Sequence, residues 1–570
     1  MRYKFYIFIL TISFSILAKA QGLILPAGAF LVQKNGNIIL GSNWKNNGTF
    51  LQIGGSLVFG GVTQTLGGTT NTAFKNIFVL TGSNTTINTP GHSISNSLKA
   101  NGTLNANGNL TLLSIATQTA FIDGSGTGQV LGNVTMERYI PSGFGYKYLS
   151  SPFQAATVME LAEDMDLAAS FPTLYRYDED LASSGWVNYV ATSGSLVPLQ
   201  GYAANLGTSA VPKTIDISGV VSNGTITSQS LYNHNRPYTK GFNLAGNPYP
   251  SPIDWNASSG WVRTNIDNAI YYFNASTTDQ YTGTYSTYIN GISSDGIASN
   301  IIPSMQGFFI HVSNGAFPVA AQLITNNNVR IPELSPVFHS FTGPLIRVDA
   351  SYSDGLISDP AVIYFDNRAT SSFNKRLDAV KLLNTNKEVP NLYAVSTDSE
   401  KLSIRAIDQP RDSLTILPLG LKTEKEGWVT FNTRNIQQVS QSMFVYLHDN
   451  VTHTYQDLRK DPGYRLYLTA GQYENRFSIV FSMAQLESVT PDTQTFDAYF
   501  SNGKLIIKTS ISTEVNSSVV ITNMMGQRIW QQPFSGNGSY TINTYLSNGT
   551  YIVTIYANKE KQSKKIYKAN

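Results

Sequence analysis

The passage LQGYAAN, residues 199–205, returns as MQGFFIH at residues 305–311. Two further passages repeat in the same order: YLSSP (148–152) as LAGNP (244–248), and LYRYD (174–178) as IYYFN (270–274). The passages YLSSP and LYRYD each lie 96 positions before their copies, whereas Gln200 and Gln306 are 106 apart, so the second copy carries an insertion before Met305. Three matched passages in register indicate an internal duplication.

The duplication predicts two related β-units within residues 136–325, with copies at about 140–235 and 236–325, packed with pseudo-two-fold symmetry. Each Gln-Gly pair is expected to form a turn or bulge that opens an apolar strand. A single helix is predicted, over Ala156–Ala169. Its acidic residues are expected to form a solvated face rather than a metal site: Glu160, Glu163, Asp164 and Asp166.

Aromatic residues are concentrated in the second copy, where NPYPSPIDW (247–255) is followed by Trp261. Three prolines in a short loop can hold an aromatic surface rigidly, and exposed rings offer sugars a flat apolar face. Tyr249, Trp255 and Trp261 are therefore candidate glycan contacts. The alternative is that these rings fill a β core, where aromatic side chains usually lie.

The acidic run Asp178-Glu179-Asp180 is a candidate for binding calcium, although it lacks the full EF-hand spacing. No other cofactor or metal is expected. We find no pair of histidines at metalloprotease spacing, no nucleophile elbow, no phosphate-binding loop and no dinucleotide fingerprint. A glycosidase needs only two carboxylates on separate strands. Four aspartates between the duplication and the C-terminal region are conceivable for that role: Asp349, Asp354, Asp359 and Asp366.

Residues 21–135 precede the duplication and are rich in Gly, Asn and Thr, with short apolar runs between turns, such as NIIL (37–40) and SLVF (56–59). NGTLNANGNL (101–110) nearly repeats every six residues. Short strands with polar corners are typical of a β-solenoid, in which each coil buries its apolar side on the next. An irregular β-sandwich is the alternative.

Residues 326–489 come after the duplication and contain alternating apolar segments such as LIRVDA (345–350) and FSIVF (477–481). This pattern predicts one further antiparallel β-sandwich. The segment AQLESVTPDTQT (484–495) is a plausible linker between this sandwich and the C-terminal region.

Residues 490–570 read as a small Ig-like sandwich of short strands. The Asn502-Gly503 pair is a hairpin signal, because a tight primed turn needs positive φ at both central residues. Three later passages bear on the nature of this region: NMMGQRIWQ (523–531), LSNGTYIV (546–553) and KKI (564–566).

In their order and terminal position, these passages resemble the type A C-terminal sorting domain of the Bacteroidetes type IX secretion system. The resemblance identifies as motif residues Gly526, Gln527, Gly549, Tyr551 and Lys565. Thr550 stands where the family usually has a small apolar residue. The resemblance implies export by the type IX outer-membrane exporter, removal of this domain, and covalent attachment to surface lipopolysaccharide or release.

The N-terminus predicts entry into the general secretory machinery. Arg2 and Lys4 precede an apolar run from Phe5 to Leu17, which is too short to span a bilayer comfortably. Ala18-Lys19-Ala20 fits a cleavage site, so residues 1–20 are a predicted signal peptide cut between Ala20 and Gln21. Both ends of the chain therefore predict a protein at the outer-membrane surface or outside the cell.

Composition narrows the function classes. The chain has a net charge of +3. It has no cysteine, and this absence excludes disulfides, cysteine nucleophiles and thiolate zinc sites. The positive charge lies at the two ends, so the body is weakly acidic, which argues against nucleic-acid binding. We expect an all-β, non-enzymatic protein in adhesion or surface structure. The alternatives are a protein that binds external glycans, or a carbohydrate-active hydrolase.

Overall fold

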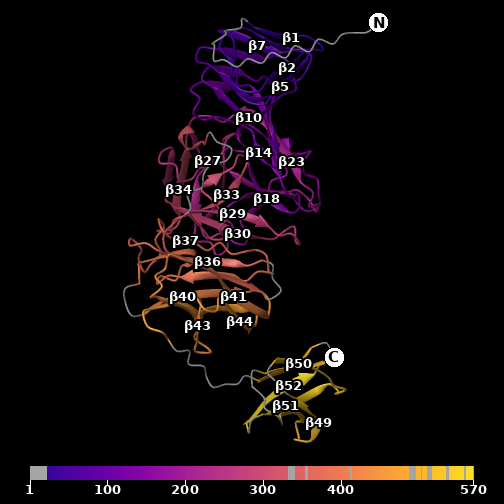
Figure 1. The fold of residues 1–570 in the computed structure, drawn as a ribbon, viewed down its shortest axis with the longest axis vertical. Coiled ribbons are helices and arrows are strands. Elements are labelled where there is room, and N and C mark those ends of the chain that lie inside the picture. The colour runs from indigo at the N-terminus through magenta and orange to yellow at the C-terminus, as the bar shows by residue number, and fades with distance from the viewer. Residues whose placement is uncertain are drawn as a thin grey trace. The chain divides into compact units, whose positions relative to one another are not determined.

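The structure is a computed structural model that describes residues 22–331, 341–352, 357–410, 414–486, 496–501, 504–509, 517–534, 538–557 and 560–568 (Figure 1). The predicted signal peptide, with Ala20 and Gln21 at its cleavage site, lies outside these residues. The chain forms two compact units: residues 1–448 with 456–486, and residues 449–455 with 487–570. The described residues confirm an all-β protein. Among them, no helix has the length and apolar composition to span a bilayer.

The first part of the larger unit is the predicted β-solenoid. Its first two coils have three strands each: β1 (Leu23–Leu25), β2 (Phe30–Gln33), β3 (Ile38–Leu40), then β4 (Trp44–Asn46), β5 (Thr49–Gln52) and β6 (Leu57–Phe59). Each strand of the first coil pairs in parallel with its equivalent in the second coil, as Leu23 does with Trp44. Trp44 then pairs in the same way with Leu66 of the third coil. One coil therefore takes about twenty residues, and the six-residue near-repeat at 101–110 does not correspond to a coil.

Later coils continue two of these three faces. Their strands are β7 (Thr63–Gly67), β8 (Ala73–Val79), β9 (Asn84–Ile87), β10 (His92–Ala100), β11 (Thr103–Asn105) and β12 (Leu110–Leu112). Glutamine amides bridge successive coils at the corners: the buried Gln33 donates to the carbonyls of Gly36 and Ser56, and its cross-coil partner Gln52 donates to those of Gly55 and Asn76. Buried backbone groups at the corners thus find partners.

The solenoid is joined to the duplicated region through a shared sheet. β17 (Asn133–Ile140) pairs in parallel with β12, and on its other side pairs antiparallel with β23 (Lys213–Val221) over eight residue pairs. Its neighbouring small strands are β13 (Ser114–Ile115), β14 (Gln118–Thr119), β15 (Phe121–Ile122), β16 (Gln129–Leu131) and β19 (Phe153–Gln154). The sheet order β19-β23-β17-β12-β10-β8-β6-β3 therefore crosses from one region into the other.

The internal duplication is confirmed strand by strand. The sheet of the first copy is β18 (Tyr146–Ser150), β22 (Gly201–Asn205), β20 (Leu174–Tyr177) and β21 (Trp186–Asn188). That of the second is β26 (Phe242–Gly246), β33 (Gly307–Val312), β29 (Ile266–Ala275), β30 (Gly283–Ile289) and β31 (Ile292–Ser293). Ser150 lies opposite Gly201, and Gly246 opposite Gly307, so the two copies share strand order and register.

The two copies contact each other with pseudo-two-fold symmetry. Leu149 bridges Gln306, and the equivalent residues Ala245 and Gln200 bridge in the reverse sense. Reciprocal contacts of this kind define a two-fold interface. The remaining strands of this region surround the two sheets: β24 (Ile226–Thr227), β25 (Leu231–Asn233), β27 (Ile253–Asp254), β28 (Trp261–Thr264), β32 (Ile301–Ile302) and β34 (Val319–Thr325).

The predicted helix over Ala156–Ala169 is wrong. The structure has a single 3-10 turn there, η1 (Val158–Leu161), followed by further turns. The carboxylates of Glu160 and Asp164 accept from the backbone N–H groups of Ser218 and Asp216 on β23, so these two half-buried residues cap a strand edge. Because these bonds reach a strand more than fifty residues away, tertiary contacts override the local helix propensity of this segment. Glu163 and Asp166 are exposed, as predicted. A second 3-10 turn, η2 (Asn327–Val329), ends the region.

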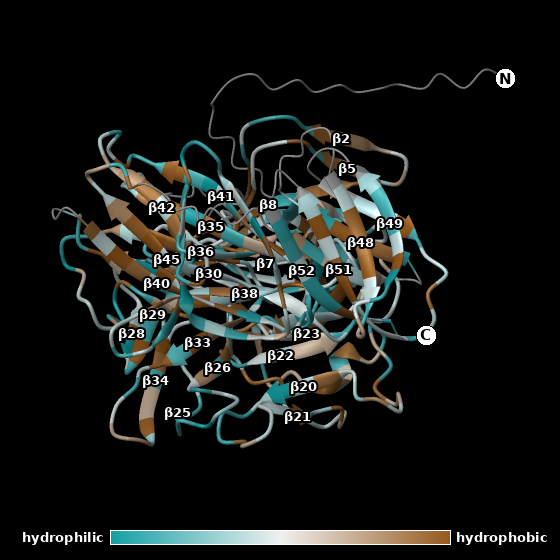
Figure 2. Ribbon diagram, turned by 90° about the horizontal axis from the view of Figure 1, so that it is seen from below, coloured by the Kyte–Doolittle hydropathy of each residue, from teal (hydrophilic) through white to brown (hydrophobic). Residues whose placement is uncertain are grey.

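Residues 341–486 form the predicted sandwich around one β-sheet. Its strands are β35 (Leu345–Tyr352), β36 (Asp359–Phe365), β37 (Ala379–Val380), β38 (Asn391–Val395), β39 (Lys401–Ile407), β40 (Leu414–Thr423), β41 (Gly427–Gln437), β42 (Phe444–Asp449), β43 (Thr454–Asp457), β44 (Gly463–Leu468) and β45 (Gly471–Ser482). Figure 2 shows hydrophobic positions interrupted by hydrophilic ones along these strands. One apolar cluster fills the sandwich, and a second joins it to the duplicated region through Phe309, Tyr271 and Tyr364.

The smaller unit has the predicted Ig-like arrangement of two sheets. The first is β46 (Phe496–Ser501), β47 (Lys504–Thr509) and β50 (Gly538–Asn543). The second is β49 (Arg528–Phe534), β48 (Ser517–Asn523), β51 (Gly549–Ala557) and β52 (Glu560–Lys568). Its own core contains Leu505, Ile521 and Val553, all buried.

Candidate functional site

The proline-rich loop that sequence analysis assigned to glycan contact is an internal joint. Tyr249 and Trp255 are completely buried. The Tyr249 hydroxyl donates to the carbonyl of Gly224, and Trp255 Nε1 donates to the carbonyl of Asn268. The prediction that these two rings are exposed is wrong, because the rigid loop packs them into the second copy instead of presenting them.

Trp261 is half-buried on β28, with its ring centroid 5.0 Å from that of Trp255. Its Nε1 donates to the carbonyl of Asp254. Its polar edge is thus used internally, and Trp261 covers the buried tryptophan.

A buried arginine, Arg330, holds the proline-rich loop in place. Arg330 donates to the Ser251 hydroxyl at 2.7 Å, and to the carbonyl of Ile122 in the solenoid at 2.5 Å. Its guanidinium lies 5.1 Å from the Tyr249 ring centroid. Burial lowers the pKa of Arg330 to about 10, so it remains charged at neutral pH. The loop and Arg330 together hold the solenoid against the second copy.

A cleft between the two copies has a volume of about 560 Å³. The first copy supplies its walls from the turns after η1, the end of β22 and Lys213, and the second copy supplies Gln280 and Tyr281. The backbone N–H of Tyr146 bonds to the carbonyl of Gln280, which ties the two copies together at the cleft. Concave sites with a few polar groups are the usual form of ligand sites.

Two aromatic rings at this cleft are exposed. Phe171 is 53% exposed and Tyr281 49%. Their ring centroids are 5.1 Å apart at an interplanar angle of 74°. Half-buried Tyr146 and Tyr175 lie behind them, with Tyr146 centred 6.3 Å from Tyr281. The rings therefore form an apolar wall beside polar groups.

Among the titratable side chains that line this cleft, Asp164 is the carboxyl group with a clearly raised pKa. Its carboxylate accepts from the backbone N–H of Asp216 at 3.3 Å. Partial burial is the main cause that raises the pKa of Asp164 to about 7, and the neighbouring carboxylates of Asp216 and Glu163 add to it. Lys213 lines the same cleft and donates to the carbonyls of Asp164 and Leu206. The cleft thus combines a carboxyl group whose pKa is about 7 with an ammonium group held in place by two hydrogen bonds.

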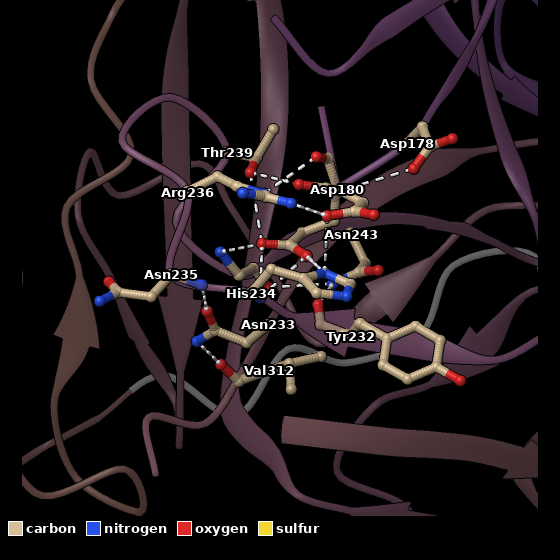
Figure 3. Close-up of polar contacts among 12 residues, drawn as sticks. Asp178, Asp180, Tyr232, Asn233, His234, Asn235, Arg236, Thr239, Asn243 and Val312 are labelled. Atoms are coloured by element: carbon tan, nitrogen blue, oxygen red, sulfur yellow. Dashed lines mark hydrogen bonds and ion pairs between the residues drawn. The ribbon is translucent and has the colours of Figure 1, made fainter. Parts of the chain in front are cut away.

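The acidic run Asp178-Glu179-Asp180 belongs to a separate polar cluster (Figure 3). The buried Glu179 carboxylate accepts from His234 Nδ1 at 2.7 Å, from the His234 backbone N–H, and from Gly241 N–H. Asp180 pairs with Arg236 at 2.6 Å. Protein donors thus occupy the oxygens that a calcium ion would need. The described residues contain no group of three His, Asp or Glu able to hold a metal.

This cluster fixes the loop that joins the two copies. Asn235, Lys240 and Gly241 in that loop have φ values of 55°, 45° and 74°. Left-handed non-glycine residues are held only where the surroundings over-determine them. The hydrogen bonds to Glu179 supply that restraint, and the loop leaves Tyr238 72% exposed.

The aspartates considered for hydrolysis are engaged in structural contacts. Asp359 is buried and both its oxygens lie 2.6 Å from Lys381 Nζ. Asp349 is buried beside Arg434 and accepts from Ser358. Asp366 pairs with Arg368, and Asp354 lies outside the described residues. The structure does not bring the three described aspartates together in a cleft.

The sorting motif residues lie at defined places in the smaller unit. Gly526, with φ 83°, and Gln527 form the turn from β48 to β49, where Asn523 N–H bonds to the carbonyl of Gln527. Gly549 begins β51, in which Tyr551 is buried and donates to the carbonyl of Ser547 at 2.8 Å. Lys565 is exposed on β52, opposite Ile552.

The fold and these residues define a class: an all-β protein whose solenoid, duplicated domain and sandwich are followed by a separate Ig-like module. Residues 501–569 match the secretion system C-terminal sorting domain. The protein is therefore a cargo of the type IX secretion system, interacts with its machinery, and is exported to the cell surface or the extracellular space. Residues 42–481 match a domain of unknown function, DUF8693, and the chain belongs to that family. No curated protein matches the chain.

Sequence reasoning missed the aromatic wall of the cleft. Phe171 precedes the first copy's β20, and Tyr281 follows the second copy's β29. Tyr281 was one of several tyrosines in an aromatic-rich copy, and Phe171 carried no signal of its own. Only the two-fold packing places the two rings together.

Proposed function

We propose that this exported protein is a non-enzymatic adhesin that binds a glycan in the cleft between its two copies. The main support for this proposal is the exposed pair Phe171 and Tyr281, which lines a cleft together with Asp164 and Lys213. Aromatic rings stack on the apolar faces of sugars, while charged and amide groups bond to hydroxyls. Export to the surface puts this cleft where external glycans are met.

The test is a glycan array probed with the exported protein and with a Phe171→Ala/Tyr281→Ala double variant. Both rings are half-exposed, so the double variant should stay folded. We expect at least a tenfold loss of binding, about 1.4 kcal/mol or more. The matched control is Tyr238→Ala, which removes an exposed ring outside the cleft. Equal binding by the double variant and the wild type would overturn the proposal.

The raised pKa of Asp164 favours a second candidate function, hydrolysis of the bound glycan. A carboxyl group whose pKa is raised to about 7 can donate a proton at neutral pH, which is the role of the acid among the two carboxyl groups of a glycosidase. Incubating bound glycans with the protein and measuring new reducing ends separates the two functions. Reducing ends that appear with wild type and disappear with Asp164→Asn would establish the hydrolase and reject the non-enzymatic role.

We also propose that the exported protein is attached to surface lipopolysaccharide after removal of the sorting domain. Residues 501–569 match the sorting domain, and the type A resemblance of this region implies attachment to lipopolysaccharide or release. Attachment predicts a ladder of slow-migrating forms on immunoblots of the outer-membrane fraction, which collapses when lipopolysaccharide synthesis is blocked. A single sharp species in the culture medium would show release.

A further inference from the structure

The cleft between the two copies is lined by more acidic than basic side chains. Three carboxyl groups line it, those of Glu163, Asp164 and Asp166, whereas Lys213 supplies one ammonium group. Glu163 and Asp166 are exposed, and Asp164 is half-buried. Charges of one sign along a concave wall focus the electric field and concentrate ions of the opposite sign. The cleft therefore favours a ligand with a positive charge.

Lys213 does not neutralise these carboxyl groups. Its Nζ donates to the backbone carbonyls of Asp164 and Leu206, at 3.2 and 2.7 Å. Within the part of the chain that the structure describes, Glu163, Asp164 and Asp166 form no ion pair with any lysine, arginine or histidine. A cationic ligand would thus meet carboxyl groups that have no protein counter-charge there.

The aromatic wall of the same cleft also suits a cation. The exposed rings of Phe171 and Tyr281 have centroids 5.1 Å apart. Tyr146 and Tyr175 continue the wall, with Tyr175 centred 6.4 Å from Phe171 and Tyr146 centred 6.3 Å from Tyr281. The faces of aromatic rings attract ammonium groups, and exposed rings also stack on the apolar face of a sugar. Rings and carboxyl groups together therefore match a sugar that bears an ammonium group.

We propose that the glycan bound in this cleft is an amino sugar with a free, protonated amino group, such as an oligomer of glucosamine. This inference rests on the proposed function, because it names the class of glycan that the cleft selects. The sugar ring stacks on Phe171 and Tyr281, and the ammonium group is attracted by Glu163 and Asp166. N-acetylation removes the positive charge, and an acidic sugar is repelled.

Binding of such a ligand is coupled to the ionisation of Asp164. Charged and titratable groups face Asp164 or its neighbour Asp216 from every element around them: Glu163 of the same turn, Lys213 of β23, Glu160 of η1, Glu137 of β17 and Tyr281 of the second copy. Burial first, and then the carboxylates of Asp216 and Glu163, raise the pKa of Asp164 to about 7, and Lys213 lowers it less than these raise it.

A bound ammonium group favours the ionised form of Asp164 and so lowers that pKa. The free protein therefore holds more protons near pH 7 than the complex does. Binding releases protons, and a ligand of fixed charge binds more tightly as pH rises through 7.

The test is isothermal titration calorimetry with three oligomers of equal length, made of glucosamine, N-acetylglucosamine and N,N,N-trimethylglucosamine. At pH 6.5 and low salt, we expect the glucosamine oligomer to bind at least tenfold more tightly than the N-acetylated one. Added salt should reduce that preference. The trimethylated oligomer keeps its charge at every pH, so its affinity should rise from pH 6 to pH 8 with release of protons to the buffer.

A double variant, Glu163→Gln/Asp166→Asn, removes two charges and leaves the aromatic rings in place. Both residues are exposed, so the fold should be kept. We expect the double variant to bind the glucosamine oligomer at least fivefold more weakly than the wild type, with unchanged affinity for the N-acetylated oligomer. The matched control is Asp408→Asn/Glu426→Gln, which neutralises two exposed carboxylates of the sandwich and should change neither affinity.

The outcomes separate this inference from the proposed function. An N-acetylated or an acidic oligomer that binds as tightly as the glucosamine oligomer, or a double variant with the wild-type preference, would overturn the inference while glycan binding stands. Oligolysine that binds as tightly as the glucosamine oligomer would also overturn it, because the cleft would then recognise charge without a sugar. Absence of binding to every glycan would reject the proposed function itself.

Discussion

Leu199 and Met305 hold equivalent places in the two copies, and both have a left-handed backbone, with φ of 68° and 57°. Each precedes the Gln-Gly pair, and both side chains are buried. Met305 O accepts from Ser150 N–H and Leu199 O accepts from Gly246 N–H, each at 3.2 Å. The strained conformation thus aims each carbonyl at the opposite copy, which explains why both copies retain it.

The glycines after these residues should be intolerant of any side chain. A Cβ at Gly201 would lie 2.5 Å from Ala245 O, and one at Gly307 would lie 2.9 Å from Leu149 O. We expect Gly201→Ala to lower stability by about 2–3 kcal/mol, and Gly307→Ala by somewhat less, because backbone must move. Thermal unfolding measures the loss. Gly463→Ala, whose Cβ meets nothing closer than 3.9 Å, is the control and should change little.

The equivalence of the two copies in the duplicated region could be predicted from sequence, because matched passages fold alike; the strand order within each copy could not. The sorting module was also predictable, since Gly526, Tyr551 and Lys565 recur in a known order at the chain's end. Both predictions rest on residue patterns that can be read along the sequence without knowledge of long-range contacts. The prediction of a helix over Ala156–Ala169 failed because Glu160 and Asp164 bind a strand that lies more than fifty residues further along the chain.

The candidate site was harder to predict, since composition does not tell whether an aromatic ring is buried. Tyr249 and Trp255 looked exposed because prolines surround them, yet Arg330 draws that loop against the solenoid. Phe171 and Tyr281 lie in different copies, so their proximity depends on the packing of two folded sheets. Periodicity along the chain carries no information about such contacts.

His92 should make the solenoid sensitive to acid. It is buried, its Nδ1 accepts from Thr72 N–H at 3.1 Å, and its Nε2 lies 2.9 Å from the Thr89 hydroxyl. Burial lowers its pKa below the ordinary 6.5. The unfolded chain therefore takes up a proton at a higher pH than the folded one, so stability falls as pH drops below about 6.5.

The measurement for this prediction is the unfolding midpoint at pH 8 and at pH 5.5. His92→Gln should be less stable than wild type at pH 8 but should lose less on acidification. His453→Gln, which changes an exposed histidine, should keep the wild-type dependence. An unchanged pH response in His92→Gln would show that other groups cause the acid sensitivity.

Arg330 should contribute strongly to the joint between solenoid and second copy. Arg330→Met leaves the carbonyl of Ile122 and the Ser251 hydroxyl without their donor, at a cost of about 3 kcal/mol. Limited proteolysis should then cut the chain near the joint earlier than in wild type. Arg368→Met, which removes an arginine that is largely exposed, should cost less than about 0.5 kcal/mol. Equal proteolysis of the two variants would contradict the assigned role.

The buried pair Asp359 and Lys381 should behave asymmetrically on mutation. Asp359→Asn leaves a buried ammonium without its counter-charge and should destabilise the sandwich by about 3–5 kcal/mol. The double change Asp359→Asn/Lys381→Met removes both charges, so it should recover much of that loss. Chemical denaturation of the three proteins measures both effects. A double variant as unstable as Asp359→Asn would mean that the pair is needed for more than charge balance.

The smaller unit should be required for export but not for folding of the larger one. Its core, with Val553 at its centre, contains no residue of the larger unit among those that the structure describes. Deleting residues 487–570 should therefore leave a folded protein that accumulates in the periplasm without its signal peptide.

Val553→Asp buries a carboxylate in that core and should likewise block export. Val62→Asp, the same substitution at a residue 81% exposed in the solenoid, should leave export unchanged. Protease treatment of intact cells distinguishes surface from periplasmic protein. Surface display of the deleted chain would mean that the exporter reads a signal outside the sorting domain.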